Sequence, residues 1–175
     1  MGGEVVVDSK YNQMVQKYSD MVYRIAFSYM KNKEDSEDIY QNVFFKLLDC
    51  RRHFSDEEHE KRWLIRVTIN ECHSLYRSPW KKHRQECEDL NDLLEKQQVM
   101  GSFEQNMTRL EEVKDMLKCL PEKYSIALYL YYYEEYSTKE IAKILRKNES
   151  TIRTHLMRGK ELLRKKMEER GIANE

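Results

Sequence analysis

This sequence of 175 residues predicts an all-α protein in which a flexible acidic linker joins two small helical domains. Only five glycines and two prolines interrupt it, and helix-favouring residues run through most of its length. Apolar residues recur at helical spacing in an N-terminal and a C-terminal block, which a polar segment separates. No apolar run approaches the roughly 20 residues that cross a bilayer, so we expect a cytoplasmic protein without membrane insertion.

The apolar pattern also predicts where the domains begin and end. An N-terminal arm (1–10) precedes the first domain (11–78). The linker (79–106) starts at a proline, which disfavours a helical residue before it. The second domain (107–170) is expected to contain a helix-turn-helix, and a short tail (171–175) follows it.

Three helices are expected in the first domain. The first covers residues 11–30, where Met14, Tyr18, Met21 and Ile25 share one face. The second begins at an acidic cluster, as helix dipoles favour, and runs to about Arg52. Residues 53–60 are polar, break the apolar period and are expected to form a loop. A third helix covers residues 61–77, with Leu64, Val67, Cys72 and Leu75 on its apolar side.

The second domain shows four helical segments. Met107–Cys119 resumes the apolar period, and a helix after Leu120 and Pro121 would bury Tyr124, Ala127, Leu128 and Tyr131. The tyrosines that follow are expected to pack between helices. Ser137–Glu140 reads as a capping box before a short helix that ends at Leu145. Residues 146–149 form the turn, with Asn148 as N-cap, and the last helix would bury Ile152, Leu156, Leu163 and Met167.

The net charge is zero, but the charges are segregated along the chain. Residues 61–84 carry a net charge of about +6, residues 85–112 about −6, and residues 137–167 about +7. Two basic blocks therefore flank an acidic segment. This distribution favours nucleic-acid binding by both ends of the chain.

Each basic block contains a set of candidate DNA-binding residues. In the third helix of the first domain, polar and basic residues repeat in steps of four, four, three and four and fall within an arc of roughly 80°. They form a basic stripe: Arg62, Arg66, Asn70, His73 and Arg77. In the helix-turn-helix, the exposed leading end of the second helix would enter the major groove. The candidates there are Thr151, Arg153, Thr154, Met157 and Arg158, with Arg153 suited to a guanine edge and Arg158 to phosphates.

We find no sequence support for catalysis, a cofactor or a metal site. A Gly-rich phosphate loop, a zinc-protease helix and a recognisable nucleophile context are all missing. Carboxylate pairs such as Glu57–Glu58 and Glu134–Glu135 lie in polar surroundings and are expected to be solvated. His83 and Cys87 have ligand spacing but no second ligand pair, so a polar linker explains them better. The four cysteines are expected to be reduced thiols.

The first domain resembles the extracytoplasmic-function sigma factors in two segments. Residues 37–44, Glu-Asp-Ile-Tyr-Gln-Asn-Val-Phe, are similar to the helix with which that family binds the clamp helices of the largest polymerase subunit. The resemblance assigns this contact to Asp38 and Gln41, with Asn42 in place of a usual Glu. Residues 63–70, Trp-Leu-Ile-Arg-Val-Thr-Ile-Asn, resemble the helix that recognises and opens the downstream promoter element. The basic stripe coincides with that helix. The resemblance also implies a base-capturing loop at about residues 54–61.

The second domain resembles the domain with which this family reads the upstream promoter element. The similarity covers Leu120-Pro121, residues 137–145, and Thr151-Ile152-Arg153 with Arg158. Ser125, Arg146-Lys147 and Gly159 depart from the usual Arg, Gly-plus-apolar pair and Ala. The resemblance implies a non-enzymatic transcription initiation factor that binds core RNA polymerase and promoter DNA, and commonly an anti-sigma protein that clamps the two domains.

Two other hypotheses remain open on the sequence alone. The chain could be a helix-turn-helix activator whose N-terminal half senses a ligand or dimerises, although this leaves the segment around Asp38 and Gln41 unexplained. It could also be a helical adaptor whose basic faces are incidental. Transcription with purified core polymerase separates the three, because only a sigma factor directs initiation by itself.

Overall fold

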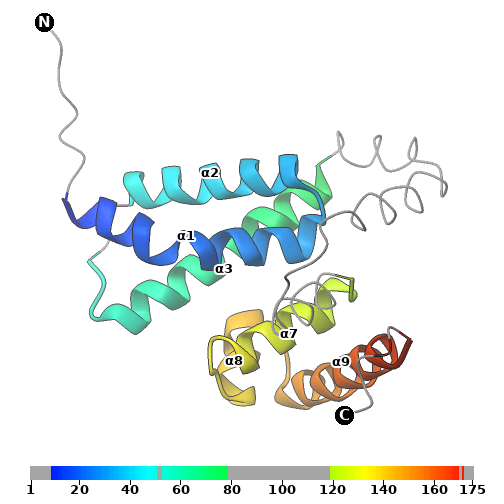
Figure 1. Cartoon of the computed structure of the whole chain (residues 1–175). Helices are drawn as coiled ribbons and strands as arrows, with labels where there is room; N and C mark the ends of the chain where they lie inside the picture. The colour runs from blue at the N-terminus through cyan, green and yellow to red at the C-terminus, as the bar shows by residue number, and fades with distance from the viewer. Residues whose placement is uncertain (1–8, 51–52, 79–118, 170, 172–175) are drawn as a thin grey trace, which may run out of the picture.

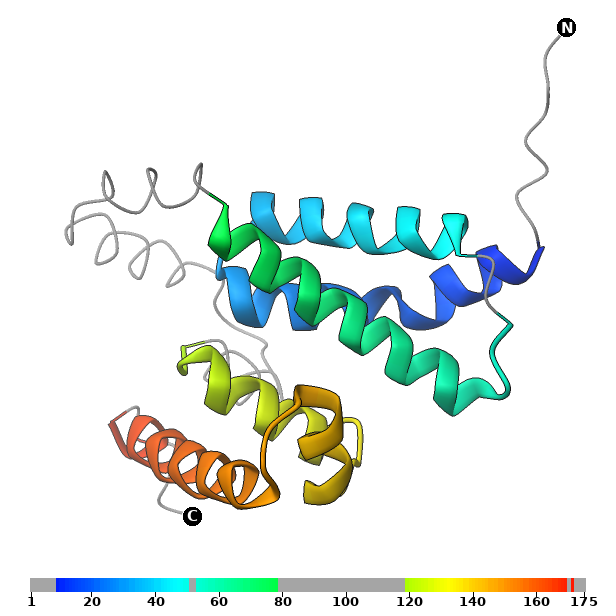
Figure 2. The same ribbon diagram turned by 180° about the vertical axis from the view of Figure 1, so that it is seen from behind.

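The computed structural model describes residues 9–50, 53–78, 119–169 and 171, and all regular structure within them is helical. Figure 1 shows two groups of helices, and Figure 2 shows the same groups from behind. The first group contains α1 (Ser9–Met30), α2 (Lys33–Asp49) and α3 (Glu57–Arg77). The second contains α7 (Glu122–Tyr132), α8 (Thr138–Leu145) and α9 (Glu149–Glu169). The predicted all-helical fold class is confirmed.

The first group is a three-helix bundle in which α1, α2 and α3 all contact one another. Its centre contains Val22, Ile25 and Ala26 of α1, none of which is exposed to solvent. The predicted apolar spacing of α1 therefore faces the core. Lys31 ends α1 in the left-handed conformation, at φ 59°. Asn32 then caps α2 by accepting a hydrogen bond from the amide of Asp35.

The boundaries of α2 and α3 differ from the prediction. Helix α2 ends at Asp49 rather than near Arg52. Helix α3 begins at Glu57, so the expectation of a loop over all of residues 53–60 is wrong for the last four. Asp56 caps the helix by accepting from the amide of His59 at 2.7 Å, and the acidic residues after it lie in the first turn. The acidic run that reads as a polar loop is therefore a helix start.

The second group contains the predicted helix-turn-helix. Ser137 and Glu140 form the expected capping box at the start of α8. The turn depends on Arg146, which adopts the left-handed conformation at φ 53° and ψ 48°. Helix α9 then buries Ile152 and Leu156 as predicted. In α7, Tyr124, Ala127 and Leu128 are buried as predicted, but Tyr131 is 38 % exposed. Ile126 and Leu130 are buried in addition.

Gly159 allows α9 to approach α7 closely. A Cβ atom placed on Gly159 would lie 2.9 Å from Cδ1 of Leu128 and 3.3 Å from Cβ of Tyr124. Carbon atoms normally pack at about 3.5–4.0 Å, so this position has no room for a side chain unless its neighbours move. The glycine thus fixes how near the second helix of the motif lies to the rest of the domain.

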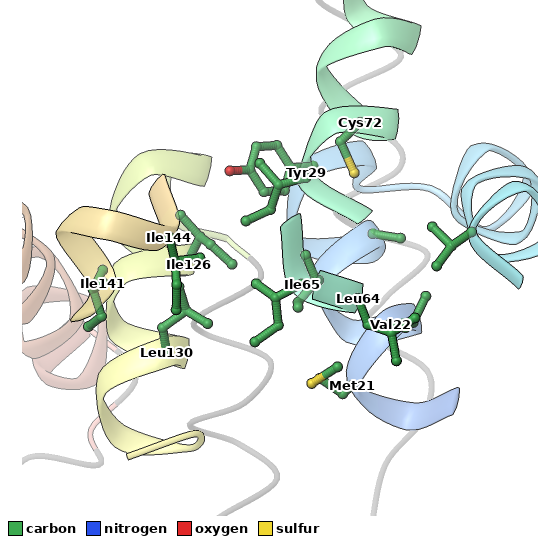
Figure 3. Close-up of a cluster of buried hydrophobic side chains, with 14 of the residues drawn as sticks. Met21, Val22, Tyr29, Leu64, Ile65, Cys72, Ile126, Leu130, Ile141 and Ile144 are labelled. Carbon is green, nitrogen blue, oxygen red and sulfur yellow. The ribbon is translucent and has the colours of Figure 1, made fainter. Parts of the chain in front are cut away.

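The two groups pack against each other, α1 on α7 and α3 on α8. Figure 3 shows Ile65 and Tyr29 on the side of the bundle that faces Ile126, Leu130 and Ile144. All five side chains are at most 5 % exposed and belong to one apolar cluster that includes both groups. The charge and apolar patterns of the sequence do not predict this contact.

Several predictions concern residues outside the described ranges. These are the linker at 79–106, residues 107–118 of the helix expected at Met107–Cys119, and the pair His83 and Cys87; Cys119 itself lies in a turn before α7. Among the helices of the described ranges, none combines the length and apolar character that a membrane span requires.

Candidate nucleic-acid and polymerase interfaces

The first candidate surface lies on α2. Asp38, Gln41 and Asn42 are all exposed, one turn apart, on the side of α2 that faces away from the buried Ile39 and Val43. They line a polar groove of about 390 Å³ between α2 and α3, to which Glu71 and Ser74 also contribute. Among the helices of the described ranges, α2 contacts only α1 and α3, so none of α7, α8 and α9 covers this face.

Two large apolar side chains continue this face and were missed in the sequence. Phe45 is 64 % exposed and Leu48 is 50 % exposed. Each lies seven residues, or about two helical turns, beyond Asp38 and Gln41 respectively. That spacing puts them on the same side of α2, and it was available from the sequence. An exposed apolar pair beside polar groups is typical of a protein-binding surface.

The second candidate surface is the basic stripe on α3. Asn70, His73 and Arg77 are exposed, as predicted. At the N-terminal end of α3, by contrast, residues of the stripe contact α8. Arg62 is half-buried, and its guanidinium pairs with Glu58 at 2.9 Å and with Glu140 of α8 at 2.7 Å. Arg66 donates to the carbonyl oxygen of Lys143 at 3.4 Å.

His73 lies in a positively charged setting. Its ring packs edge-on against Tyr29, with centroids 5.5 Å apart. Burial lowers the pKa of His73, and the charges of Arg77 and Lys147 lower it further, while Glu122 opposes them. Lys147 belongs to the turn before α9, so the second domain contributes to the electrostatics of the stripe.

The third candidate surface is the leading end of α9. Arg153 and Met157 are 70 % and 61 % exposed, respectively. Arg158 is also exposed, and it lines an open groove with Arg164 and Lys165. These positions lie opposite the buried Ile152 and Leu156.

Local hydrogen bonds hold this end of α9 in place. Thr138 at the start of α8 donates to Glu149 at 2.7 Å, and Arg153 pairs with the same carboxylate at 2.8 Å. Thr154 is partly buried, and its hydroxyl donates to the carbonyl oxygen of Ser150 at 3.0 Å. Thr151 is also partly buried. Of the five predicted residues, Arg153, Met157 and Arg158 are therefore the most exposed, and Thr151 and Thr154 are partly accessible.

His155 is not part of this surface. Its ring packs edge-on against Tyr124 of α7, with centroids 5.6 Å apart. Burial lowers its pKa, as do the charges of Lys147, Lys123 and Arg158. The ring therefore supports α9 from the interior of the domain.

The prediction that Glu134 is solvated is wrong. Glu134 was expected to be solvated, but its side chain is only 13 % exposed and pairs with Lys61 at 2.7 Å. Among the described residues, no group of three or more His, Cys, Asp and Glu side chains is arranged to hold a metal ion.

Comparisons with known proteins give the same division into two parts. Residues 14–82 match the family model "Sigma-70 region 2", and residues 110–163 match "Sigma-70, region 4". The chain is similar to "ECF RNA polymerase sigma factor SigM" of Bacillus subtilis (strain 168), with 30 % identity over 94 % of this chain and 98 % of the relative. It is 26 % identical to "RNA polymerase sigma factor SigV" of the same organism, over 81 % of each chain.

A crystal structure shares the fold. The sigma factor RpoE from Bartonella quintana, in complex with the anti-sigma factor NepR, superimposes with a TM-score of 0.60. The match covers 89 % of this chain and 95 % of that one, at 21 % sequence identity. The likeness therefore extends to both helical domains.

Proposed function

This chain belongs to the extracytoplasmic-function sigma factors of RNA polymerase, which initiate transcription and are not enzymes, and we propose that three of its surfaces divide that task. Helix α2 binds core polymerase, α3 recognises and opens the downstream promoter element, and the leading end of α9 reads the upstream element. A family match to both domains leaves no separate sensing domain in the N-terminal half, as an activator would need.

The polymerase contact is assigned to Asp38, Gln41 and Asn42. Their exposure on one face of α2, which none of the described helices α7, α8 and α9 contacts, supports this role. Phe45 and Leu48 extend the same face with apolar area that a partner can cover.

The downstream element is assigned to the basic stripe, Arg62, Arg66, Asn70, His73 and Arg77. This assignment rests on one observation: the stripe presents cations and an amide from a single helix face, and from Arg62 to Arg77 no acid of α3 lies within it, although Glu58 one turn earlier pairs with Arg62. Cations bind the phosphates, while Asn70 can hydrogen-bond to base edges. The base-capturing loop, implied at residues 54–61, would combine a short segment before Asp56 with the first turn of α3.

The upstream element is assigned to Thr151, Arg153, Thr154, Met157 and Arg158. In a helix-turn-helix, the leading residues of the second helix approach the bases of the major groove. Arg153 is the exposed cation nearest that end and can make two hydrogen bonds to one guanine. Arg158, with Arg164 and Lys165 beside it, suits the phosphate backbone.

Run-off transcription with purified core polymerase tests the proposed function. The chain should direct initiation from its own promoter without another sigma factor. A variant in which Asp38 is replaced by Arg serves as the matched control, since it should fold but fail to bind the polymerase. Transcription that required a second sigma factor would contradict the proposal.

We further propose that the protein acts in the cytoplasm, with the polymerase, and that an anti-sigma protein restrains it. The similarity to a sigma factor crystallised with its anti-sigma factor supports this partner.

A further inference from the structure

Three cationic side chains form a line along one side of α9: Arg153, Lys160 and Arg164. They follow one another after seven and then four residues, which is about two turns and then about one turn of the helix. Arg153 pairs with Glu149 at 2.8 Å, and Arg164 pairs with Glu168 at 3.0 Å. Within the described ranges no carboxylate pairs with Lys160, so its charge is the one in this line that is available to an anion.

Two exposed tyrosines at the end of α7 lie beside Lys160. Tyr131 is 38 % exposed and Tyr132 is 54 % exposed, and their rings meet edge to face with centroids 5.0 Å apart. The Nζ atom of Lys160 lies 5.3 Å from the ring centroid of Tyr132, and a hydrogen bond with the Tyr132 hydroxyl raises the pKa of Lys160. Unlike the buried Tyr136, these two rings are open to solvent, so helix packing does not account for them.

The hydrogen bond between Lys160 and Tyr132 has only one possible direction. An ammonium group can donate but not accept, so Lys160 donates and the phenolic oxygen of Tyr132 accepts. The O–H of Tyr132 is then left to donate to another acceptor, and Lys160 has further N–H groups to donate. A cation and a neutral O–H donor side by side suit an acceptor with several charged oxygens, as in a phosphodiester.

The pair lies on the side of α9 that faces the DNA backbone in this type of motif. In a helix-turn-helix the second helix enters the major groove, while the first helix crosses the backbone. The first helix here is α8, and its Thr138 donates to the same Glu149 carboxylate that pairs with Arg153. Arg153 therefore lies on the side of α9 next to the start of α8, and Lys160 follows on that side two turns later.

We propose that Tyr132 and Lys160 together bind one phosphate of the DNA backbone beside the upstream promoter element. The inference rests on the proposed reading of that element by α9. It adds a contact from α7, which lies outside the two helices of the helix-turn-helix, and Tyr131 supports the Tyr132 ring edge-on. Because a phosphate carries no base identity, this contact fixes the position of α9 in the groove and does not select a sequence.

A protein partner is the alternative occupant of two exposed aromatic rings, and the neighbouring side chains argue against it. A docking surface for a protein is expected to continue into further apolar side chains. The exposed apolar residues in the described part of α9 are Met157, at its leading end, and Leu162, which lies about 200° around the helix from Lys160. Residues 137–167 also carry a net charge of about +7, which favours a polyanion.

The first measurement is the affinity of the full-length protein for upstream duplex at several salt concentrations, by fluorescence anisotropy. Lys160→Gln should weaken binding about eightfold at about 0.1 M salt, because one phosphate contact contributes about 0.9 to log affinity for each tenfold dilution of salt below about 1 M. The slope of log affinity against log salt concentration should fall by about one. Tyr132→Phe keeps the ring but removes the O–H, so it should weaken binding about threefold without changing the slope. Both losses should be the same on DNA altered at the contacted bases.

Lys123→Gln is the matched control. Lys123 lies at the other end of α7, and its Nζ atom is 5.0 Å from the ring centroid of Tyr124. The substitution therefore removes the same charge from the same kind of lysine–tyrosine pair, and it should change the affinity for upstream duplex by less than about twofold. Since Lys160 and Tyr132 are exposed, their variants should keep the helical circular dichroism spectrum.

The second measurement locates the phosphate. A set of duplexes, each with one uncharged methylphosphonate linkage along the upstream element, is titrated with the wild type and with Lys160→Gln. At one linkage the wild type should lose about eightfold in affinity, whereas Lys160→Gln should lose less than about twofold because it already lacks the contact. At the other linkages the two proteins should respond alike.

The outcomes separate this inference from the proposed function. Unchanged affinity and salt slope of Lys160→Gln, or the absence of any linkage at which the two proteins differ, would overturn the phosphate contact. An equal loss in Lys123→Gln would show a general charge effect and overturn it as well. So would a loss of core-polymerase binding by Lys160→Gln with DNA binding intact, which would assign the tyrosines to a protein interface. If Arg153→Ala still changes the base preference in these cases, the upstream role of α9 stands.

Discussion

Gly159→Ala is expected to destabilise the C-terminal domain, although the substitution removes a glycine from within helix α9. Alanine is favoured over glycine inside a helix by about 1 kcal/mol, so helix propensity alone predicts stabilisation. The structure opposes this gain. A Cβ on Gly159 would lie 2.9 Å from Cδ1 and 3.2 Å from Cγ of Leu128, and 3.3 Å from Cβ of Tyr124.

The size of the effect follows from how little these neighbours can move. Leu128 is 2 % exposed and Tyr124 is 8 % exposed, so neither can rotate into solvent. Adding a methyl group to a filled core typically costs about 1–3 kcal/mol. After the propensity gain is subtracted, the expected loss is about 0–2 kcal/mol, carried by the contact between α7 and α9.

Amide hydrogen exchange in α7 and α9 measures this loss locally, without requiring both domains to unfold together. Gly159→Ala should speed exchange in both helices. In a Leu128→Ala background, the side-chain atoms closest to the added Cβ are missing. There the same substitution should slow exchange, by an amount that corresponds to at most the helix-propensity difference of about 1 kcal/mol. Slower exchange of α9 in the otherwise wild-type protein would refute the close approach.

Four further predictions concern the functional surfaces and their charges. Asp38→Arg should weaken core-polymerase binding by several kcal/mol, because it replaces an anion in the interface by a cation that has no partner there. A pull-down should show the lost binding while the variant keeps its fold. Asn70→Ala should reduce the promoter bubble seen by permanganate footprinting more than it reduces polymerase binding; unchanged melting would leave the stripe as solvated surface. Arg153→Ala should reduce the binding free energy by about 1–3 kcal/mol on the preferred upstream element, and by much less on DNA altered at the contacted base pair. Arg158→Ala should weaken binding to all sequences alike and lower the slope of log affinity against log salt concentration by about one. The pKa of His73, measured by NMR, should lie below 6.5, since burial and nearby cations favour the neutral ring; the folded state therefore loses stability as the pH falls from about 6.5 through that pKa, and an unshifted pKa would contradict the packing.

Where the local signals agree, the sequence predicts the structure well. The apolar spacing of Met14, Tyr18, Met21 and Ile25 places α1, and all four side chains are buried. The capping box at Ser137 places the start of α8. These features depend on neighbours three or four residues away, so they can be read from a short window.

Signals with two meanings led to errors. The acids after Asp56 suit a polar loop as well as the first turn of a helix, and the cap decides between them. Helix α7 has apolar or aromatic side chains on nearly every side, so its period does not indicate which face is buried; Tyr131 was placed inside for this reason. The contact between the domains depends on residues about 80 positions apart, such as Arg62 and Glu140, and no local pattern contains it.

Glu140 takes part both in the folding of the second domain and in the contact of that domain with the first. Hydrogen bonds from Ser137 lower the pKa of this carboxyl, and the charge of Arg62 lowers it further. The same charged group therefore caps α8 and closes the contact with α3. A lowered carboxyl pKa means that this stabilisation is complete above the ordinary value and is lost as the pH falls through the folded value. At neutral pH the carboxylate is charged, so the capping box of α8 also carries the group that pairs with Arg62 of α3. The zero net charge of the chain thus includes ion pairs in which acids of the second domain neutralise cations of the first.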